Sequence, residues 1–108
     1  TGSPVNVRAL MQMKLESSQA VLRGLALDDH QLLAKESQKL QLLNLDASWN
    51  VVQTKEYARI SAEFRDAAKK IHRAAEKKNL DAAGLGYFQL TMTCIDCHRH
   101  VRASTAQQ

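Results

Sequence analysis

The chain has few of the residues that interrupt helices or form strands. Its 108 residues include one proline and only 5% aromatic residues, whereas leucine and alanine, which favour helices, are abundant. No stretch alternates apolar and polar residues as a strand would. No apolar run approaches the roughly 18 residues of a membrane-crossing helix. We therefore expect one all-α domain, residues 1–108, with no membrane span.

Several function classes lack their usual signals. The sequence shows no acid–base pair, no nucleophile arrangement and no phosphate loop, so we expect no enzymatic turnover. The formal net charge is +4, but the basic residues are spread along the chain and are not interleaved with aromatics, which argues against nucleic-acid binding. We interpret them mainly as a solvated face. A second interpretation is a docking surface for an acidic partner protein.

The only two cysteines stand together in Cys94-Ile95-Asp96-Cys97-His98. Two thiols three residues apart, followed directly by a histidine, are typical of covalent haem attachment. On a helix, positions 94, 97 and 98 share one face. Each thiol can then add across one haem vinyl group while the His98 imidazole points at the iron. The motif predicts one haem c, bound through Cys94 and Cys97 with His98 as an iron ligand.

Three other interpretations compete with haem. Cys94, Cys97, His98 and His100 could bind zinc, although four ligands within seven residues fit poorly around one tetrahedral ion. The two thiols could cycle to a disulfide, but such motifs normally begin a helix beside a βαβ unit. The cysteines could also be ordinary core residues, with His98 at the surface.

Capping residues and apolar spacing predict four helices, roughly 4–25, 28–45, 54–78 and 80–103. Their short connections favour an antiparallel up-down-up-down four-helix bundle. We expect Gly24 to supply a left-handed residue near the end of the first helix, Gly84 and Gly86 to permit close helix packing, and Trp49 to lie in the second connection. The predicted starts are Pro4, Asp28 or Asp29, Thr54, and Asn79 with Asp81.

Residues at helical spacing define the expected inward faces. The first helix is expected to bury Val7, Leu10, Met11, Leu15, Ser18, Val21, Leu22 and Leu25. The third is expected to bury Tyr57, Ile60, Phe64, Ala67, Ala68, Ile71 and Ala75.

The same topology suggests a second iron ligand. The start of the first helix should lie beside the end of the fourth, with Met11 roughly 10 Å and His98 roughly 7–8 Å from that end. A haem between these helices could bind His98 on one side and Met11 on the other. Met13 is the rival, but it lies about 200° around the helix from Met11. If Met11 only packs on the ring, the iron stays five-coordinate.

With these residues in view, the chain resembles the class II c-type cytochromes, the cytochrome c-prime family, over almost its whole length. Cys94, Cys97 and His98 match the haem motif, and Arg102 matches a basic residue near the proximal haem face. The segment 21–24 (Val-Leu-Arg-Gly) is similar to the family's first-helix ending, and counting back from it puts Met11 at the distal position. The resemblance implies a haem-binding four-helix bundle. Methionine at the distal position implies a low-spin electron carrier, whereas leucine there is typical of gas-binding members.

We therefore expect an exported monohaem c-type cytochrome, a one-electron carrier with His/Met-ligated low-spin haem. Five-coordinate binding of NO or CO is the alternative, and a haem-free redox or zinc bundle is the third hypothesis. Arg8, Arg102 and Leu15 are the further predicted haem contacts. Covalent attachment implies export, so we expect a removed signal peptide and a periplasmic location. The expected partners are redox proteins, and the chain is expected to be a monomer or homodimer.

Overall fold

Four helices make up nearly all of the computed structural model, which describes residues 4–45, 52 and 54–106. They are α1 (Pro4–Leu27), α2 (His30–Asn44), α3 (Lys55–Glu76) and α4 (Leu80–Ala106). The described residues contain no strand. The all-α prediction is confirmed for this part of the chain.

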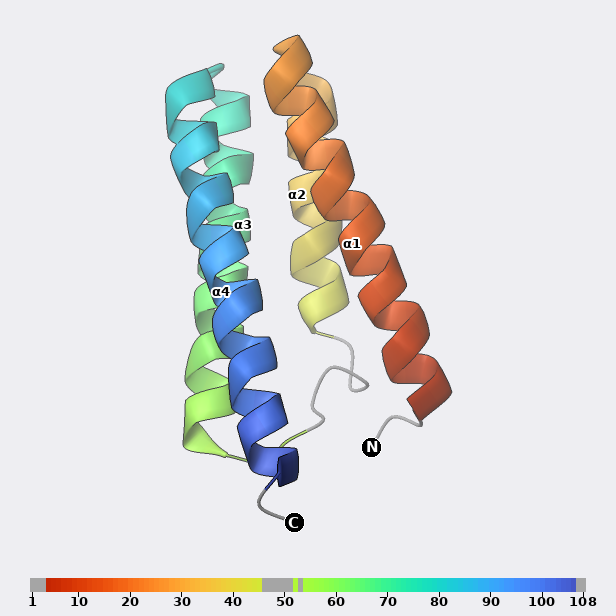
Figure 1. Cartoon of the computed structure of the whole chain (residues 1–108). Coiled ribbons are helices and arrows are strands. Elements are labelled where there is room, and N and C mark those ends of the chain that lie inside the picture. Colours follow the sequence, from red (N-terminus) through yellow and green to blue (C-terminus); the bar gives the residue numbers. More distant parts are fainter. Residues whose placement is uncertain (1–3, 46–51, 53, 107–108) are drawn as a thin grey trace.

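The helices pack mainly in chain order. α1 packs on α2, α2 on α3 and α3 on α4, whereas α1 and α4 touch at few points. The molecule measures 45 × 23 × 18 Å. Figure 1 shows the start of α1 and the end of α4 at one end of this long shape, and the α1–α2 and α3–α4 connections at the other.

Three helices begin at side chains that accept a hydrogen bond from a free backbone N–H. Asp29 accepts from the amide of Leu32 at 3.1 Å, and Thr54 accepts from that of Tyr57 at 3.0 Å. Asn79 does the same for Ala82 at 3.1 Å. These caps satisfy donors that have no partner inside the helix. The predicted helix starts are thus confirmed at these sites to within a residue or two, whereas α4 continues to Ala106, past its predicted end at 103.

The prediction for Gly24 is wrong. α1 continues to Leu27, and the left-handed residue at its end is Asp28, with φ of 54°. Gly24 lies inside the helix, where a Cβ atom would meet Leu33 Cδ2 at 2.9 Å. Its small size lets α2 approach α1, and that packing requirement replaces the expected turn.

The core prediction is confirmed for α3 and partly wrong for α1. All seven predicted α3 positions are buried. On α1, however, Leu15 and Leu22 are 49% and 53% exposed, and Lys14 and Ser17 are buried in their place. The inward side of α1 is rotated because this helix packs on α2 and scarcely on α4. Leucines on its far side therefore meet solvent.

Two further sequence predictions concern the connection and membrane crossing. Trp49 and its neighbours, residues 46–51 and 53, lie outside the described residues. Within the described part, no helix combines the length and the apolar character that a bilayer crossing requires.

The two glycines of α4 provide a matched test of helix packing. A Cβ atom at Gly86 would meet Ile71 Cγ1 at 2.9 Å and the Ile71 backbone nitrogen at 3.2 Å, whereas one at Gly84 would have nothing within 4 Å. We predict that Gly86→Ala lowers the free energy of unfolding by about 1 kcal/mol or more through overpacking. Gly84→Ala should raise it by up to about 1 kcal/mol through helix propensity. Urea unfolding followed by circular dichroism measures both, and equal effects would contradict the close α3–α4 contact.

Candidate functional site

The cysteine–histidine motif lies on the C-terminal part of α4. Cys94 and Cys97 are free thiols and both are half-buried. They pack against the core beside Leu90 and Val101, on the side of α4 that faces the other helices. His98 lies at the more exposed rim of this region.

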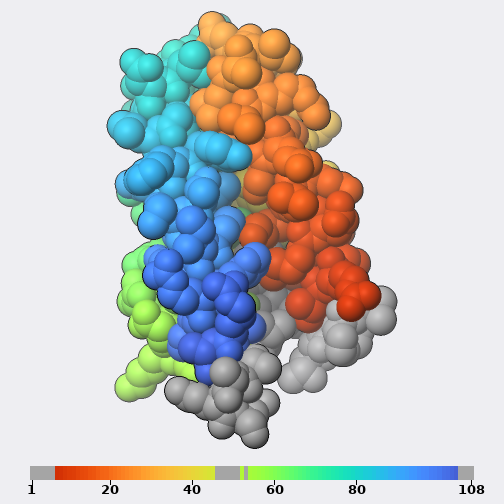
Figure 2. All heavy atoms as spheres, viewed as in Figure 1, coloured from red at the N-terminus to blue at the C-terminus, as the bar shows by residue number. Residues whose placement is uncertain are grey.

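Two cavities adjoin the motif. The first, about 260 Å³ in volume, is lined by residues from α1, α3 and α4: Val7, Met11, Tyr57, Cys97, His98, Val101 and Arg102. A second, more enclosed cavity of only about 10 Å³ is lined by Met11, Lys14, Ile60, Phe64, Thr93, Cys94, Cys97 and His98. Figure 2 shows a recess in the surface between the first part of α1 and the last part of α4. Met11, Cys97 and His98 line both cavities.

The structure separates the two candidate methionines. Met11 is half-buried and lines both cavities, whereas Met13 is exposed and lines neither. The structure thus places Met11, and not Met13, beside the cysteine–histidine motif. Whether Met11 binds iron stays a prediction.

The other predicted contacts divide in the same way. Arg102 lines the larger cavity, whereas Arg8 is exposed and lines neither one. Leu15 also lines neither cavity, because the rotation of α1 turns Lys14 inward at this level and leaves Leu15 in solvent. The structure thus brings Met11, Cys94, Cys97, His98 and Arg102 together, without Leu15 or Arg8.

Lys14 is the residue that sequence reasoning missed. It is only 8% exposed and lines the enclosed cavity with the motif. A lysine is normally assigned to the solvent side of a helix, since its ammonium group is costly to bury. Its spacing of three residues from Met11, one helical turn, was the available signal.

Partial burial and nearby charges shift the pKa values of Cys97 and His98. Burial raises the pKa of the Cys97 thiol, against the opposing effects of the Lys14 charge and of a side-chain hydrogen bond with Tyr57. It lowers the pKa of His98, and the positive charges of Lys14 and Arg102 lower it further. His98 is therefore held in its neutral form, the form that can ligate a metal.

Three observations concern the redox-thiol and zinc interpretations. A reactive redox thiol needs a lowered pKa, whereas that of Cys97 is raised and the motif lies far from the start of α4. His100 lies about 200° around the helix from His98 and its Nε2 is 2.7 Å from the Thr54 hydroxyl. Among the residues that the structure describes, no three His, Cys, Asp or Glu side chains are placed to hold one metal ion.

Comparisons of this chain with protein-family models, with curated proteins and with solved structures give no match. The function is therefore argued from the residues of the chain itself.

The electrostatics of the site predict a pH dependence. In the folded haem-free chain the imidazole of His98 should titrate below the ordinary value of about 6.5. Below about pH 6.5 the folded state then binds fewer protons at His98 than the unfolded state does. The free energy of unfolding therefore keeps its full value above about pH 6.5 and decreases as the pH drops below it. Lys14→Met should raise the pKa of His98, because it removes a facing positive charge.

Nuclear magnetic resonance of the histidine ring protons measures this titration directly. Lys39→Met, at an exposed position on α2, is the matched control and should leave His98 unchanged. If His98 has a pKa above 6.5, or if Lys14→Met leaves that pKa unchanged, the Lys14 ammonium group is not placed beside the imidazole as described.

Proposed function

We propose that this protein is an exported c-type cytochrome, an up-down-up-down four-helix bundle that carries one electron on a single covalent haem. The observation that carries the proposal is the shared lining of the two cavities. Met11 from the first helix and Cys97 and His98 from the last, far apart in the sequence, border the same spaces.

The donor set fits a haem. Cys94 and Cys97 are free thiols on the side of α4 that borders the enclosed cavity, as thioether bonds to one porphyrin edge require. The neutral imidazole of His98 and the soft thioether of Met11 are both suitable ligands for iron. Tyr57, Ile60 and Phe64 would give the ring an apolar wall.

A porphyrin is larger than the 260 Å³ cavity, so the bound form needs more room. The sparse contact between α1 and α4 provides it. A small outward movement of the first part of α1 would widen this space, because few packed side chains separate α1 from α4. Lys14 and Arg102 would then offer positive charge to the two haem propionates.

The residues that would ligate the iron favour electron transfer. Bound haem supplies an iron that cycles between Fe(III) and Fe(II). If Met11 and His98 both ligated the iron, no position would remain for a substrate, and the iron would need little rearrangement between oxidation states. Exposed Arg8, Arg99 and Arg102 belong to the same end of the bundle. They would favour docking of an acidic redox partner.

The covalent attachment of haem is the first point to test. We predict that the chain, exported together with a haem-attachment system, acquires one haem that stays bound after denaturation. Cys94→Ala and Cys97→Ala should each lose one thioether bond, which shifts the ferrous absorption bands and is visible by mass spectrometry of the haem peptide. A colourless chain that contains zinc and no iron would instead support the haem-free hypothesis.

The sixth ligand is tested by a pair of methionine variants. Met11→Ala should convert low-spin ferric haem to a high-spin form, abolish the long-wavelength sulfur-to-iron absorption band and let CO bind the ferrous protein rapidly. Met13→Ala should change none of these, because Met13 is exposed and lines neither cavity. Optical spectra and CO mixing experiments on both variants provide the measurement.

The alternative function is distinguished by the same experiment. If the unmodified protein already has high-spin haem and binds NO or CO without Met11→Ala, it is a gas-binding protein, and Met11 merely packs on the ring. A spectrum altered by Met13→Ala and unaffected by Met11→Ala would refute the assignment of Met11.

A further inference from the structure

The outer side of the α3–α4 pair carries two rows of side chains, which together we name the α3–α4 face. Both rows follow helical spacing, so each lies along one side of its helix. The α3 row consists of Glu63, Asp66, Lys70, Arg73 and Lys77, and the α4 row consists of Asp81, Leu85, Phe88, Met92, Ile95 and Arg99.

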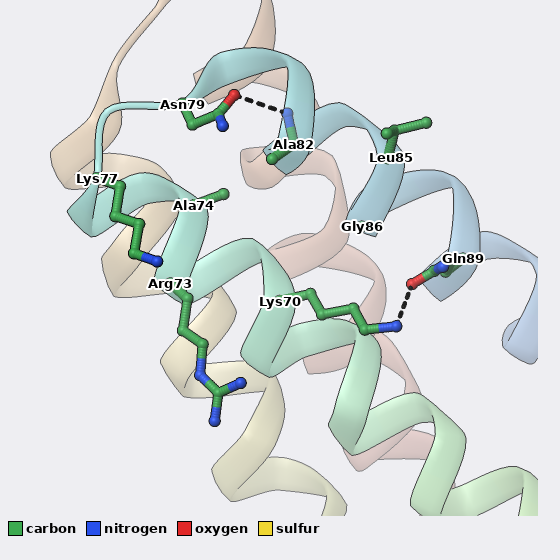
Figure 3. Close-up of a pocket in the computed structure, with 9 residues that line it drawn as sticks. All are labelled: Lys70, Arg73, Ala74, Lys77, Asn79, Ala82, Leu85, Gly86 and Gln89. Atoms are coloured by element: carbon green, nitrogen blue, oxygen red, sulfur yellow. Dashed lines mark hydrogen bonds between the residues drawn. The ribbon is translucent and has the colours of Figure 1, made fainter.

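The α3 row is acidic in its first half and basic in its second. Asp66 lies 3.5 Å from Lys70, and Glu63 is bonded to Arg59 at 2.6 Å. Arg73 and Lys77 have no acidic partner among the described residues, although both border a groove of about 370 Å³ beside α4. Figure 3 shows this groove, with Lys70 reaching across to Gln89.

The α4 row is apolar in the middle and charged at its ends. Phe88 is 64% exposed, and Leu85, Met92 and Ile95 are exposed as well. A second groove of about 290 Å³ lies between Phe88 and Met92 on α4 and Glu63 and Asp66 on α3. A continuous row of exposed apolar side chains is characteristic of an interaction surface.

Each row matches a second copy of itself that runs in the opposite direction. Glu63 and Lys77 each lie seven residues from Lys70, and Asp66 and Arg73 lie four and three residues from it, so acid stands opposite base when the row is reversed. About Leu90, Phe88 mirrors Met92 and Leu85 mirrors Ile95. The end residues Asp81 and Arg99 also mirror each other about Leu90.

The two centres lie at the same level of the molecule. Lys70 Nζ is 3.2 Å from Gln89 Oε1, so the middle of the α3 row is beside the middle of the α4 row. A single two-fold axis that crosses both helices at this level would therefore satisfy both rows at once. Lys70 would lie near the axis and keep its own Asp66 as partner.

We propose that a second copy of this chain docks on the α3–α4 face to form a two-fold symmetric homodimer. α3 lies antiparallel to the second copy's α3, which pairs acidic with basic halves, and α4 lies antiparallel to the second copy's α4, which covers the apolar row. A two-fold axis parallel to the helices would instead set the charged row of one copy on the apolar row of the other. The interface is self-complementary, as two-fold symmetry requires, and it does not depend on the proposed function.

Charge reversal tests the pairing by sedimentation velocity on the full-length chain. We expect a dimer that weakens with salt. Glu63→Lys with Asp66→Lys, and separately Arg73→Glu with Lys77→Glu, should each weaken self-association by at least about tenfold, because two pairs of like charges then face each other at each of the two symmetry-related ends. An equimolar mixture of these two double variants should form heterodimers. In such a heterodimer the acidic-to-basic substitutions of one chain face the basic-to-acidic substitutions of the other, so opposite charges meet again.

Matched controls separate this face from general effects. Lys35→Glu with Lys39→Glu reverses two exposed charges on α2 and should leave the dimer intact. Phe88→Lys should weaken the dimer, whereas Leu27→Lys, at a residue that is 67% exposed and off this face, should not. Circular dichroism verifies that each variant is folded.

Three results would overturn the proposal. One is a chain that stays monomeric at low salt up to high micromolar concentration. Another is a dimer that tolerates both charge reversals and Phe88→Lys. The third is failure of the mixed variants to associate, which would leave the α3–α4 face to a different, acidic or basic, partner.

Discussion

The light packing between α1 and α4 is the constraint on which this structure depends. Each helix packs firmly on its neighbour in the chain, but the first and last helices touch at few points. In a closed bundle, closely packed side chains would fill the space between α1 and α4, which we call the α1–α4 seam. Here the seam instead holds cavities at the end where Met11 and His98 lie, with Lys14 and Arg102 adding positive charge. The candidate site thus consists of the cavities that remain where α1 and α4 do not pack closely.

α4 carries apolar side chains on two opposite sides. Its inner side carries Leu90, Cys94 and Cys97 toward the core and the cavities, whereas its outer side exposes Leu85, Phe88 and Met92. A helix with apolar residues all around is normally buried. In the proposed homodimer the second copy would cover this outer row, and the inner side would remain available to the site.

Much of this fold was predictable from the sequence. The caps at Asp29, Thr54 and Asn79 and the inward residues of α3 follow from local spacing and hydrogen-bonding chemistry, which a sequence displays directly. The approach of Met11 to His98 followed from alternating helix directions alone. Such features depend on residues close in sequence, or on one simple topological rule.

The features that escaped prediction depend on contacts between helices. The rotation of α1 that buries Lys14 and exposes Leu15 arises because α1 packs on α2 more than on α4. Gly24 lies inside α1, where the absence of a Cβ atom leaves room for Leu33. The complementarity of the α3–α4 face became visible only when the contact between Lys70 and Gln89 fixed the relative level of the two helices.

The central proposal is that the Met11 sulfur on α1 and a His98 nitrogen on α4 would both ligate the iron of one haem. X-ray absorption at the iron edge of the purified ferric protein tests it most directly, because it reports the number and type of atoms bound to iron. The account predicts a six-coordinate iron with five nitrogen ligands and one sulfur. A five-coordinate iron, or a sixth ligand that is nitrogen or oxygen, would contradict it.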